Sequence, residues 1–229
     1  MSKKVKISTE NRDSEVETAS SEYDSSDISS DDLLDCIHVK DLPIEDFNFL
    51  LGRTKFFSET DPLYNNLLDK AFVTCNDIVL YYILLIDYTK ILSLVDKKIK
   101  KHINNLIVDS KVDKEDLVMI YADKLCNIDV KEVVESLRSL NFYKNNYLFV
   151  SKCYHPSQEE KEEFLEVFSD FKEEGDNLEI LPVRIEEIFL NKISKFKKNM
   201  QVSSAPYQMF ILGKEDIEEY VKILEKEIN

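Results

Sequence analysis

The chain has 229 residues, of which 43% are hydrophobic, and a formal net charge of −15 at pH 7. This length suits one domain of ordinary size, alone or with a tail. The charge argues against general nucleic-acid binding, which relies on Lys and Arg to neutralise phosphates. It is compatible with a basic partner, whose encounter it would accelerate, or with solubility alone. The longest apolar run, residues 78–86, is too short to span a bilayer, and the N-terminus has no apolar signal segment.

Residues 1–35 differ in composition from the rest of the chain. They hold ten acids and four bases, a net charge of −6, which leaves −9 for the remainder. Ordering such a segment costs about 1–2 kcal/mol per residue in backbone entropy, and it has little apolar surface to offset that cost. We therefore expect a disordered, acidic, Ser-rich tail over residues 1–35 and one globular domain over residues 36–229.

The first half of that domain begins with a weakly alternating stretch, residues 37–42, which predicts a strand. Apolar spacing predicts a short helix over residues 47–57. A cap residue followed by proline predicts a helix over residues 61–72. The β-branched and aromatic stretch 78–88 has the composition of a strand buried on both faces.

The middle of the chain carries two helical patterns. Apolar residues recur with helical spacing from Lys90 to Leu106, which predicts one helix. Residues 117–127 fit a strand or a helix equally well. Asp129 with Glu132 three residues later is a capping box, and it predicts a helix over residues 129–140.

The C-terminal part predicts two further strands and three helices. Residues 147–154 and 207–213 are the strands, residues 159–171 form an acidic helix, and Pro182 begins a helix that continues to Phe196. The last helix turns one apolar face inward, made of Ile217, Tyr220, Val221, Leu224 and Ile228. Strands that alternate with helices predict an α/β fold, a sheet covered by helices.

The sequence contains only three glycines, Gly52, Gly175 and Gly213. A loop that cradles phosphates needs clustered glycines so that the backbone can approach the ligand. Nucleotide-binding loops and the pyrophosphate loop of acyl-CoA enzymes are therefore absent, and we expect no cofactor.

No pattern of catalytic or metal-binding residues emerges. The four cysteines form no C-x-x-C pair, so neither a zinc site nor a disulfide framework is predicted, and a reducing compartment is expected. We expect His38, His102 and His155 to be surface or turn residues rather than ligands, because they are far apart in the sequence. Cys153 and His155 could form a nucleophilic pair, but no orienting residue is evident, which favours a buried packing thiol.

Two short segments are rich in lysine, residues 97–102 and 194–200. Each could contact phosphate or acidic groups. A solvated surface is the favoured interpretation of both segments. Residues 194–200 are also expected at the C-terminus of a helix, where lysine is stabilising.

Several stretches, taken in order, resemble the eukaryotic BCCIP family. The resemblance covers residues 37–229 and rests on residues 46–57, 78–90, 121–137, 146–154, 184–196 and 207–228. The chain departs from the family pattern where Ala122, Asp123 and Lys124 stand for Ser, Glu and Arg. Asp129 and Val130 replace a double proline, and two loops are short.

The resemblance implies a mixed β-sheet covered by helices on both faces, similar to GCN5-type N-acetyltransferases but without their activity. It implies a non-enzymatic binding protein: a chaperone and nuclear export factor for a basic large-subunit ribosomal protein, L-fourteen in the universal naming, in ribosome biogenesis. Such a protein would shuttle between nucleus and cytoplasm. Family members also export a phosphoinositide kinase, and mammalian members bind a breast-cancer susceptibility protein and a cyclin-kinase inhibitor.

Three alternatives remain open from the sequence. One is an acyl-CoA-dependent N-acetyltransferase on the same fold, which the missing glycine loop disfavours. Another is a genome-maintenance or cell-cycle adaptor. A third is an RNA-binding factor acting through residues 97–102, which the net charge disfavours.

The tail is interpreted as an electrostatic arm for the basic client. Its acids nearest the domain are the candidate client-binding residues: Glu22, Asp24, Asp27, Asp31, Asp32 and Asp35. Ser14, Ser21 and Ser29 each have an acid three residues later, as acid-directed kinases prefer, and are candidate phosphosites. Each phosphate would add a charge of about −1.5 to −2.

Overall fold

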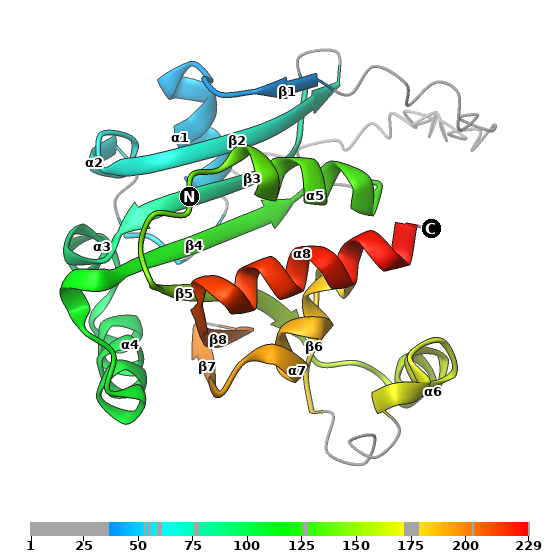
Figure 1. Cartoon of the computed structure of the whole chain (residues 1–229). Coiled ribbons are helices and arrows are strands. Elements are labelled where there is room, and N and C mark those ends of the chain that lie inside the picture. Colours follow the sequence, from blue (N-terminus) through cyan, green and yellow to red (C-terminus); the bar gives the residue numbers. More distant parts are fainter. Residues whose placement is uncertain are drawn as a thin grey trace, which may run out of the picture. The chain divides into compact units, whose positions relative to one another are not determined.

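The structure is a computed structural model of the whole chain (Figure 1). It describes residues 37–52, 54, 56–58, 61–75, 78–125, 128–171, 179–202 and 204–228. The chain divides after Leu34 into two units, and every described residue belongs to the second, Asp35–Asn229. The predicted tail, with its client-binding acids and phosphosites, lies outside the described residues.

One mixed sheet of eight strands organises the described domain. Seven strands follow the order β1-β2-β3-β4-β5-β8-β7, and β6 pairs with β5 beside this path. Only β4 and β5 run parallel among these pairs. The strands are β1 Ile37–Val39, β2 Leu67–Cys75, β3 Ile78–Asp87, β4 Leu117–Lys124, β5 Asn146–Tyr154, β6 Leu181–Pro182, β7 Phe196–Val202 and β8 Ala205–Gly213.

Helices cover both faces of this sheet, which confirms the predicted fold class. One face packs against α1 Ile44–Gly52, α2 Asp61–Tyr64, α3 Tyr88–Leu94 and α4 Lys97–Ser110. The other packs against α5 Val130–Ser139, α6 Gln158–Val167, the 3-10 helix η4 Ile185–Phe189, α7 Leu190–Ile193 and α8 Lys214–Ile228. Figure 1 shows α5 and α8 side by side on this second face.

Strand β3 shows why its sequence is apolar throughout. Its side chains alternate between the two cores: Tyr82, Leu84 and Ile86 lie in one, and Tyr81, Ile83 and Leu85 lie in the other. A central strand covered on both faces has no solvent side, so polar alternation is lost. The predictions of β3, β5, β8, α5, α6 and α8 are all confirmed.

The predicted helices before β3 are shorter than expected. Helix α1 ends at Gly52, and Phe57 instead forms an isolated bridge with Val95. The helix that begins at Asp61 lasts one turn before β2 starts at Leu67. The capping signal is local, whereas β2 pairs with β3 from Leu67 to Cys75, with two register shifts.

The single helix predicted from Lys90 is two helices. Helix α3 ends at Leu94, Val95 is extended, and Asp96 caps the start of α4 by accepting hydrogen bonds from the amides of Lys98 and Ile99. The segment that fitted strand or helix equally well is strand β4.

The prediction of one helix from Pro182 to Phe196 is wrong. Pro182 ends β6, a 3-10 helix and one turn of α7 follow, and Phe196 begins the edge strand β7. The basic segment 194–200 therefore lies largely on a strand and not at a helix C-terminus. Ile228, predicted to face inward, is 41% exposed. Among the described helices, none has the length and apolar composition needed to cross a bilayer.

Candidate functional site

The parallel strands β4 and β5 separate partway along their length. Their pairing starts at Leu117 and Asn146 and ends at Tyr121 and Val150. Beyond this point β4 continues to pair with β3, while β5 continues to pair with β8. In open α/β sheets, ligands commonly bind outside the carboxyl ends of parallel strands. A ligand site is therefore expected where β4 and β5 separate.

On the face that carries α8, the chain itself fills this region. Strand β6 pairs with the end of β5, joining Leu181 to Tyr154 and Pro182 to Cys153. The amide of Val183 donates a 2.9 Å hydrogen bond to the carbonyl of Lys152. Helix η4 follows, and Ile188 is 1% exposed. A segment of this chain thus lies where a ligand would have to enter.

The segment formed by β6 and η4 carries a buried ion pair. Arg184, the residue before η4, and Glu187 within η4 are each 2% exposed, and their side chains form an ion pair. The hydroxyl of Ser151 on β5 donates a 2.5 Å hydrogen bond to Glu187 Oε2. Burial raises the pKa of Glu187 to about 7, although Arg184 and the Ser151 hydrogen bond oppose the shift. The ion pair of Glu187 with Arg184 raises the pKa of the guanidinium, despite burial, so it stays charged.

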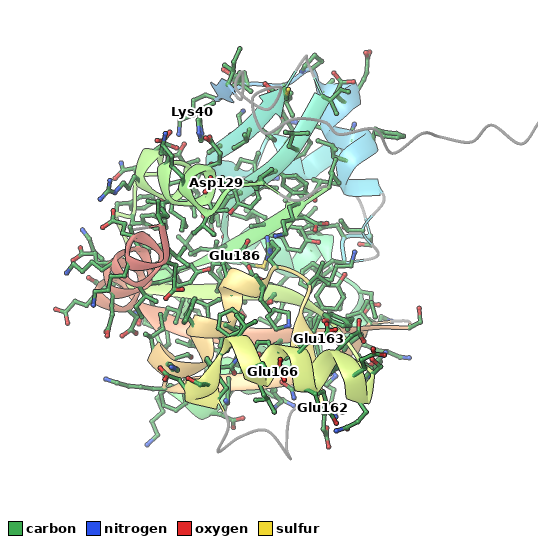
Figure 2. All side chains as sticks on the ribbon, turned by 90° about the vertical axis from the view of Figure 1, so that its right-hand side faces the viewer. Lys40, Asp129, Glu162, Glu163, Glu166 and Glu186 are labelled. Atoms are coloured by element: carbon green, nitrogen blue, oxygen red, sulfur yellow. The ribbon has the colours of Figure 1, made fainter. Side chains whose placement is uncertain are left out.

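A second buried contact ties the same segment to β4. Lys124 Nζ lies 3.4 Å from Glu186 Oε2, and Glu186 is 4% exposed (Figure 2). Its other oxygen, Oε1, has no hydrogen-bond partner among the described residues. The charged groups of η4 therefore bridge β4 and β5 across the point where these strands separate.

The opposite face of the separation is closed by aromatic rings. Tyr121 lies at the last paired position of β4, with the ring of Phe57 4.9 Å and that of Phe56 5.3 Å from its centroid. Phe56 also contacts Tyr207 on β8 at 5.5 Å. Burial raises the pKa of Tyr207 to about 12, so its hydroxyl stays protonated at neutral pH. These tyrosines belong to the core.

Helix α5 follows β4, and its N-terminus already has an anionic cap. The Asp129 carboxylate accepts a 2.9 Å hydrogen bond from the amide of Lys131. Glu132 adds a second acid in the first turn, and its carboxylate contacts His38 rather than completing the capping box. A phosphate at this helix terminus would meet two negative charges, which opposes the favourable helix dipole.

An exposed acidic surface is provided by α6. Ser157 caps the N-terminus of this helix and forms a capping box with Glu160. In the described part of the chain, no lysine or arginine forms an ion pair with the acids of α6. Figure 2 shows Glu162, Glu163 and Glu166 along this helix. We call the five exposed carboxylates the α6 acidic surface: Glu159, Glu160, Glu162, Glu163 and Glu166.

The two basic segments lie on neighbouring elements of the structure, but their lysines lie toward opposite ends of α4. Helix α4 packs against β7, and Lys198 on β7 lies 3.6 Å from Asp109 on α4. A pocket of about 400 Å³ lies at the start of α4, beside Lys97, Lys98 and Gln201. Its helix amides are already bonded to Asp96. The sequence-based prediction considered the two segments separately, because no local pattern shows that α4 and β7 are neighbours.

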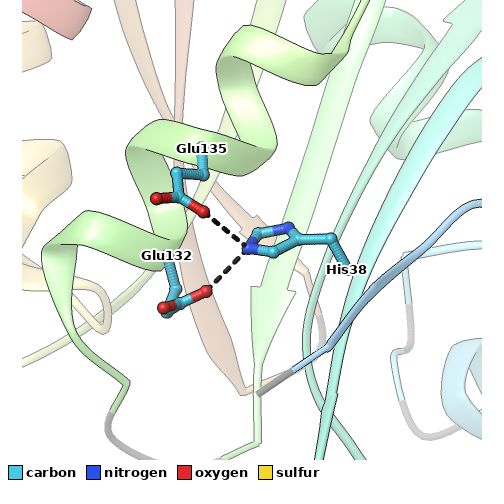
Figure 3. A group of neighbouring side chains, drawn as sticks. All are labelled: His38, Glu132 and Glu135. Carbon is cyan, nitrogen blue, oxygen red and sulfur yellow. Dashed lines mark hydrogen bonds and ion pairs between the residues drawn. The ribbon is translucent and has the colours of Figure 1, made fainter. Parts of the chain in front are cut away.

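The remaining candidate residues lie apart. Cys153 is 3% exposed, and burial raises its pKa to about 12, so the thiol is protonated at neutral pH. His155 Nδ1 lies 3.1 Å from the carbonyl of Glu179 in an exposed position, and His102 lies on α4. His38 lies on β1, and its Nε2 contacts two carboxylates of α5 (Figure 3).

Sequence reasoning missed the buried charged residues at the start of η4 and just before it. Arg184, Glu186 and Glu187 stand among apolar residues, and their charge predicted exposure. A possible signal was the position of Ser151, a polar residue in the middle of the apolar strand β5.

Comparison with known proteins agrees with the architecture. Neither a protein-family model nor a curated protein sequence matches this chain. The crystal structure of BCP1 from Saccharomyces cerevisiae is similar, with a TM-score of 0.54 and 13% sequence identity. The similarity covers 83% of this chain and 87% of the BCP1 chain. At this identity, what the two proteins are shown to share is the fold.

Proposed function

We propose that this protein is a non-enzymatic, BCCIP-like chaperone for a basic large-subunit ribosomal protein, L-fourteen in the universal naming. The observation that carries the proposal is the α6 acidic surface, five exposed carboxylates without a cationic partner among the described residues. The fold shared with yeast BCP1, a BCCIP homologue, supports the same assignment. Nuclear export, shuttling and a phosphoinositide kinase cargo are part of this proposal through the family resemblance.

The mechanism is electrostatic. An unassembled ribosomal protein exposes lysines and arginines that will later face RNA phosphates. Residues 36–229 carry a net charge of −9 and can cover such a surface while accelerating the encounter. RNA, with its higher charge density, then displaces the chaperone from its client. The acidic residues 1–35 would add to the same attraction.

The alternative of an N-acetyltransferase finds little support in the described residues. The region beyond the separation of β4 and β5 holds Pro182 and η4 of the same chain. The helix terminus that follows β4 is capped by Asp129. An acyl-CoA ligand would have to displace Pro182 and η4, and its phosphates would have to overcome the negative charge of Asp129. Clear thermal stabilisation by acetyl-CoA would favour the enzyme over the chaperone.

A neutralisation experiment tests the role of the α6 acidic surface. The full-length variant Glu162→Gln/Glu163→Gln/Glu166→Gln is titrated with purified L-fourteen ribosomal protein at low salt. We expect affinity to fall severalfold with no loss of folding, because all three side chains are exposed. Removal of residues 1–35 is expected to weaken binding severalfold as well.

A matched control changes the same charge elsewhere. Glu215→Gln/Glu218→Gln/Glu219→Gln removes three exposed carboxylates from α8. Equal losses in both triple variants would mean that net charge alone drives binding and that α6 is not the contact surface. Absence of binding by the unmodified protein would refute the chaperone proposal itself.

A further inference from the structure

His38 on β1 lies against two glutamates of α5 (Figure 3). Its Nε2 is 2.6 Å from Glu132 Oε2 and 3.4 Å from Glu135 Oε2. The three donor atoms all lie within 4.8 Å of one another. Glu132 and Glu135 are three residues apart on one helix, so both carboxylates point from the same face. The edge strand and the helix together present one nitrogen and two oxygens to a single point.

We propose that His38, Glu132 and Glu135 form a binding site for a divalent transition-metal ion, with zinc as the preferred ion. One imidazole and two carboxylates are ligands that zinc accepts, and three protein ligands leave a fourth position for water. In a tetrahedral site with metal–ligand distances of about 2.0–2.1 Å, neighbouring donor atoms are separated by about 3.3 Å. The 3.4 Å distance from His38 Nε2 to Glu135 Oε2 is already close to this value, and the Glu132 oxygen, at 2.6 Å, needs to move away by about 0.7 Å.

The second ring nitrogen of His38 is also positioned. Its Nδ1 lies 3.4 Å from the hydroxyl oxygen of Ser136, a fully buried side chain on α5. Metal-binding histidines usually place their other ring nitrogen against such a partner, which orients the ring and leaves the metal-facing nitrogen free to bind. Ser136 is therefore a positioning residue in this proposal.

Charge and access favour a cation at this point. Two carboxylates face one imidazole, and Lys131 lies 4.0 Å from the other oxygen of Glu135. The side chains of His38 and Glu135 are 28% and 48% exposed. Glu135 also lines a pocket of about 370 Å³ with Arg138 and Glu225. An ion can reach the three donors from solvent without opening the core.

The sequence predicted no metal site because His38 is distant from the two glutamates and no C-x-x-C or His-rich spacing marks the position. The proposal does not depend on the chaperone function. A metal ion here would link the three-residue strand β1, which pairs with β2 and with no other strand of the described residues, to helix α5.

The test is zinc binding by the full-length chain, prepared without a polyhistidine tag and stripped with a chelator. Calorimetric titration with zinc chloride is compared with His38→Ala and Glu135→Gln. We expect binding of zinc by the unmodified protein, and a loss of affinity of about tenfold or more in both variants. Zinc should raise the thermal unfolding midpoint of the unmodified protein but not that of Glu135→Gln, because only a ligand of the folded state stabilises it.

Two features keep this test decisive. Glu135→Gln leaves the 2.6 Å contact between His38 and Glu132 in place, so folding should persist even if His38→Ala unfolds. The control His155→Ala removes an exposed imidazole elsewhere and should leave zinc affinity unchanged. Zinc affinity that is equal in the unmodified protein and Glu135→Gln, as binding to thiols would give, overturns the proposal. Failure of the unmodified protein to bind micromolar zinc overturns it as well.

Discussion

At the scale of single residues, the buried pair Arg184–Glu187 is the least expected feature of the domain. Replacing such a pair by apolar residues is often neutral for stability, whereas removing one partner leaves a buried charge and costs about 3–5 kcal/mol. Here Glu187 also accepts the hydrogen bond of Ser151 on β5. The pair therefore fixes the orientation of η4 against the sheet more than it adds to overall stability.

The raised pKa of Glu187 predicts a pH dependence. Its carboxyl has a pKa of about 7 in the folded protein and 4.5 as the ordinary value. The Glu187 carboxyl thus holds its proton more tightly in the folded state than in the unfolded state. The stability that this group contributes is present below about pH 4.5 and is lost as pH rises to about 7. Between pH 5 and pH 8 the stability of the unmodified protein should fall by about 2 kcal/mol relative to Glu187→Gln.

The measurement is urea unfolding of both proteins at the two pH values. The difference in unfolding free energy between the unmodified protein and Glu187→Gln is the quantity compared. If the unmodified protein instead gains stability relative to Glu187→Gln as pH rises, the prediction is wrong. That result would mean that Arg184 lowers the pKa of Glu187 more than burial raises it.

Residue-level inference from sequence succeeded where the cause was local. Asp129 does cap α5, as its position before an amphipathic stretch predicted. Glu132 was assigned to the same cap, but its carboxylate lies 2.6 Å from His38, a residue 94 positions away. No local pattern contains that contact, and the same holds for Ser151 with Glu187.

At the scale of elements, β6 and η4 distinguish this sheet from one with an open ligand site. Their apolar residues belong to the core beneath α8, with Leu181 and Ile188 nearly fully buried. Burying such side chains contributes about 1.5–3 kcal/mol each. The segment is thus held by packing as well as by its ion pairs.

Two substitutions in η4 test this assignment. Ile188→Ala should lower the unfolding free energy by about 2–4 kcal/mol, because it leaves a cavity in a closed core. Ile185→Ala, three residues earlier and 38% exposed, should cost about 1 kcal/mol or less. Denaturant unfolding of the two variants gives the comparison. Similar small losses would mean that the segment between β6 and α7 contributes little to the core.

Element prediction failed where pairing between distant strands outweighed a local signal. Asp61 and Pro62 predicted a long helix, yet β2 begins at Leu67 because its ladder with β3 extends over the whole strand. Phe196 fitted a helical period but begins β7, which pairs with β8 through Val202. Strand β3 and helices α5 and α8 were predicted well, because composition and apolar spacing alone define them.

At the scale of the described domain, charge is distributed unevenly. The α6 acidic surface holds five exposed carboxylates, whereas two lysine-rich segments lie on the neighbouring elements α4 and β7. Composition predicted the net charge of −9 for residues 36–229 but could not predict this separation, because it depends on how the sheet orders its strands. A client with one strongly basic surface would be oriented by such an arrangement.

We propose that this protein binds a basic ribosomal protein through electrostatic complementarity. The most direct measurement is the affinity of the full-length chain for purified L-fourteen ribosomal protein over a series of salt concentrations. We predict equimolar binding at low salt that weakens steadily as salt rises, because exposed charges are screened. No binding at low salt, or an affinity that salt leaves unchanged, would contradict the account.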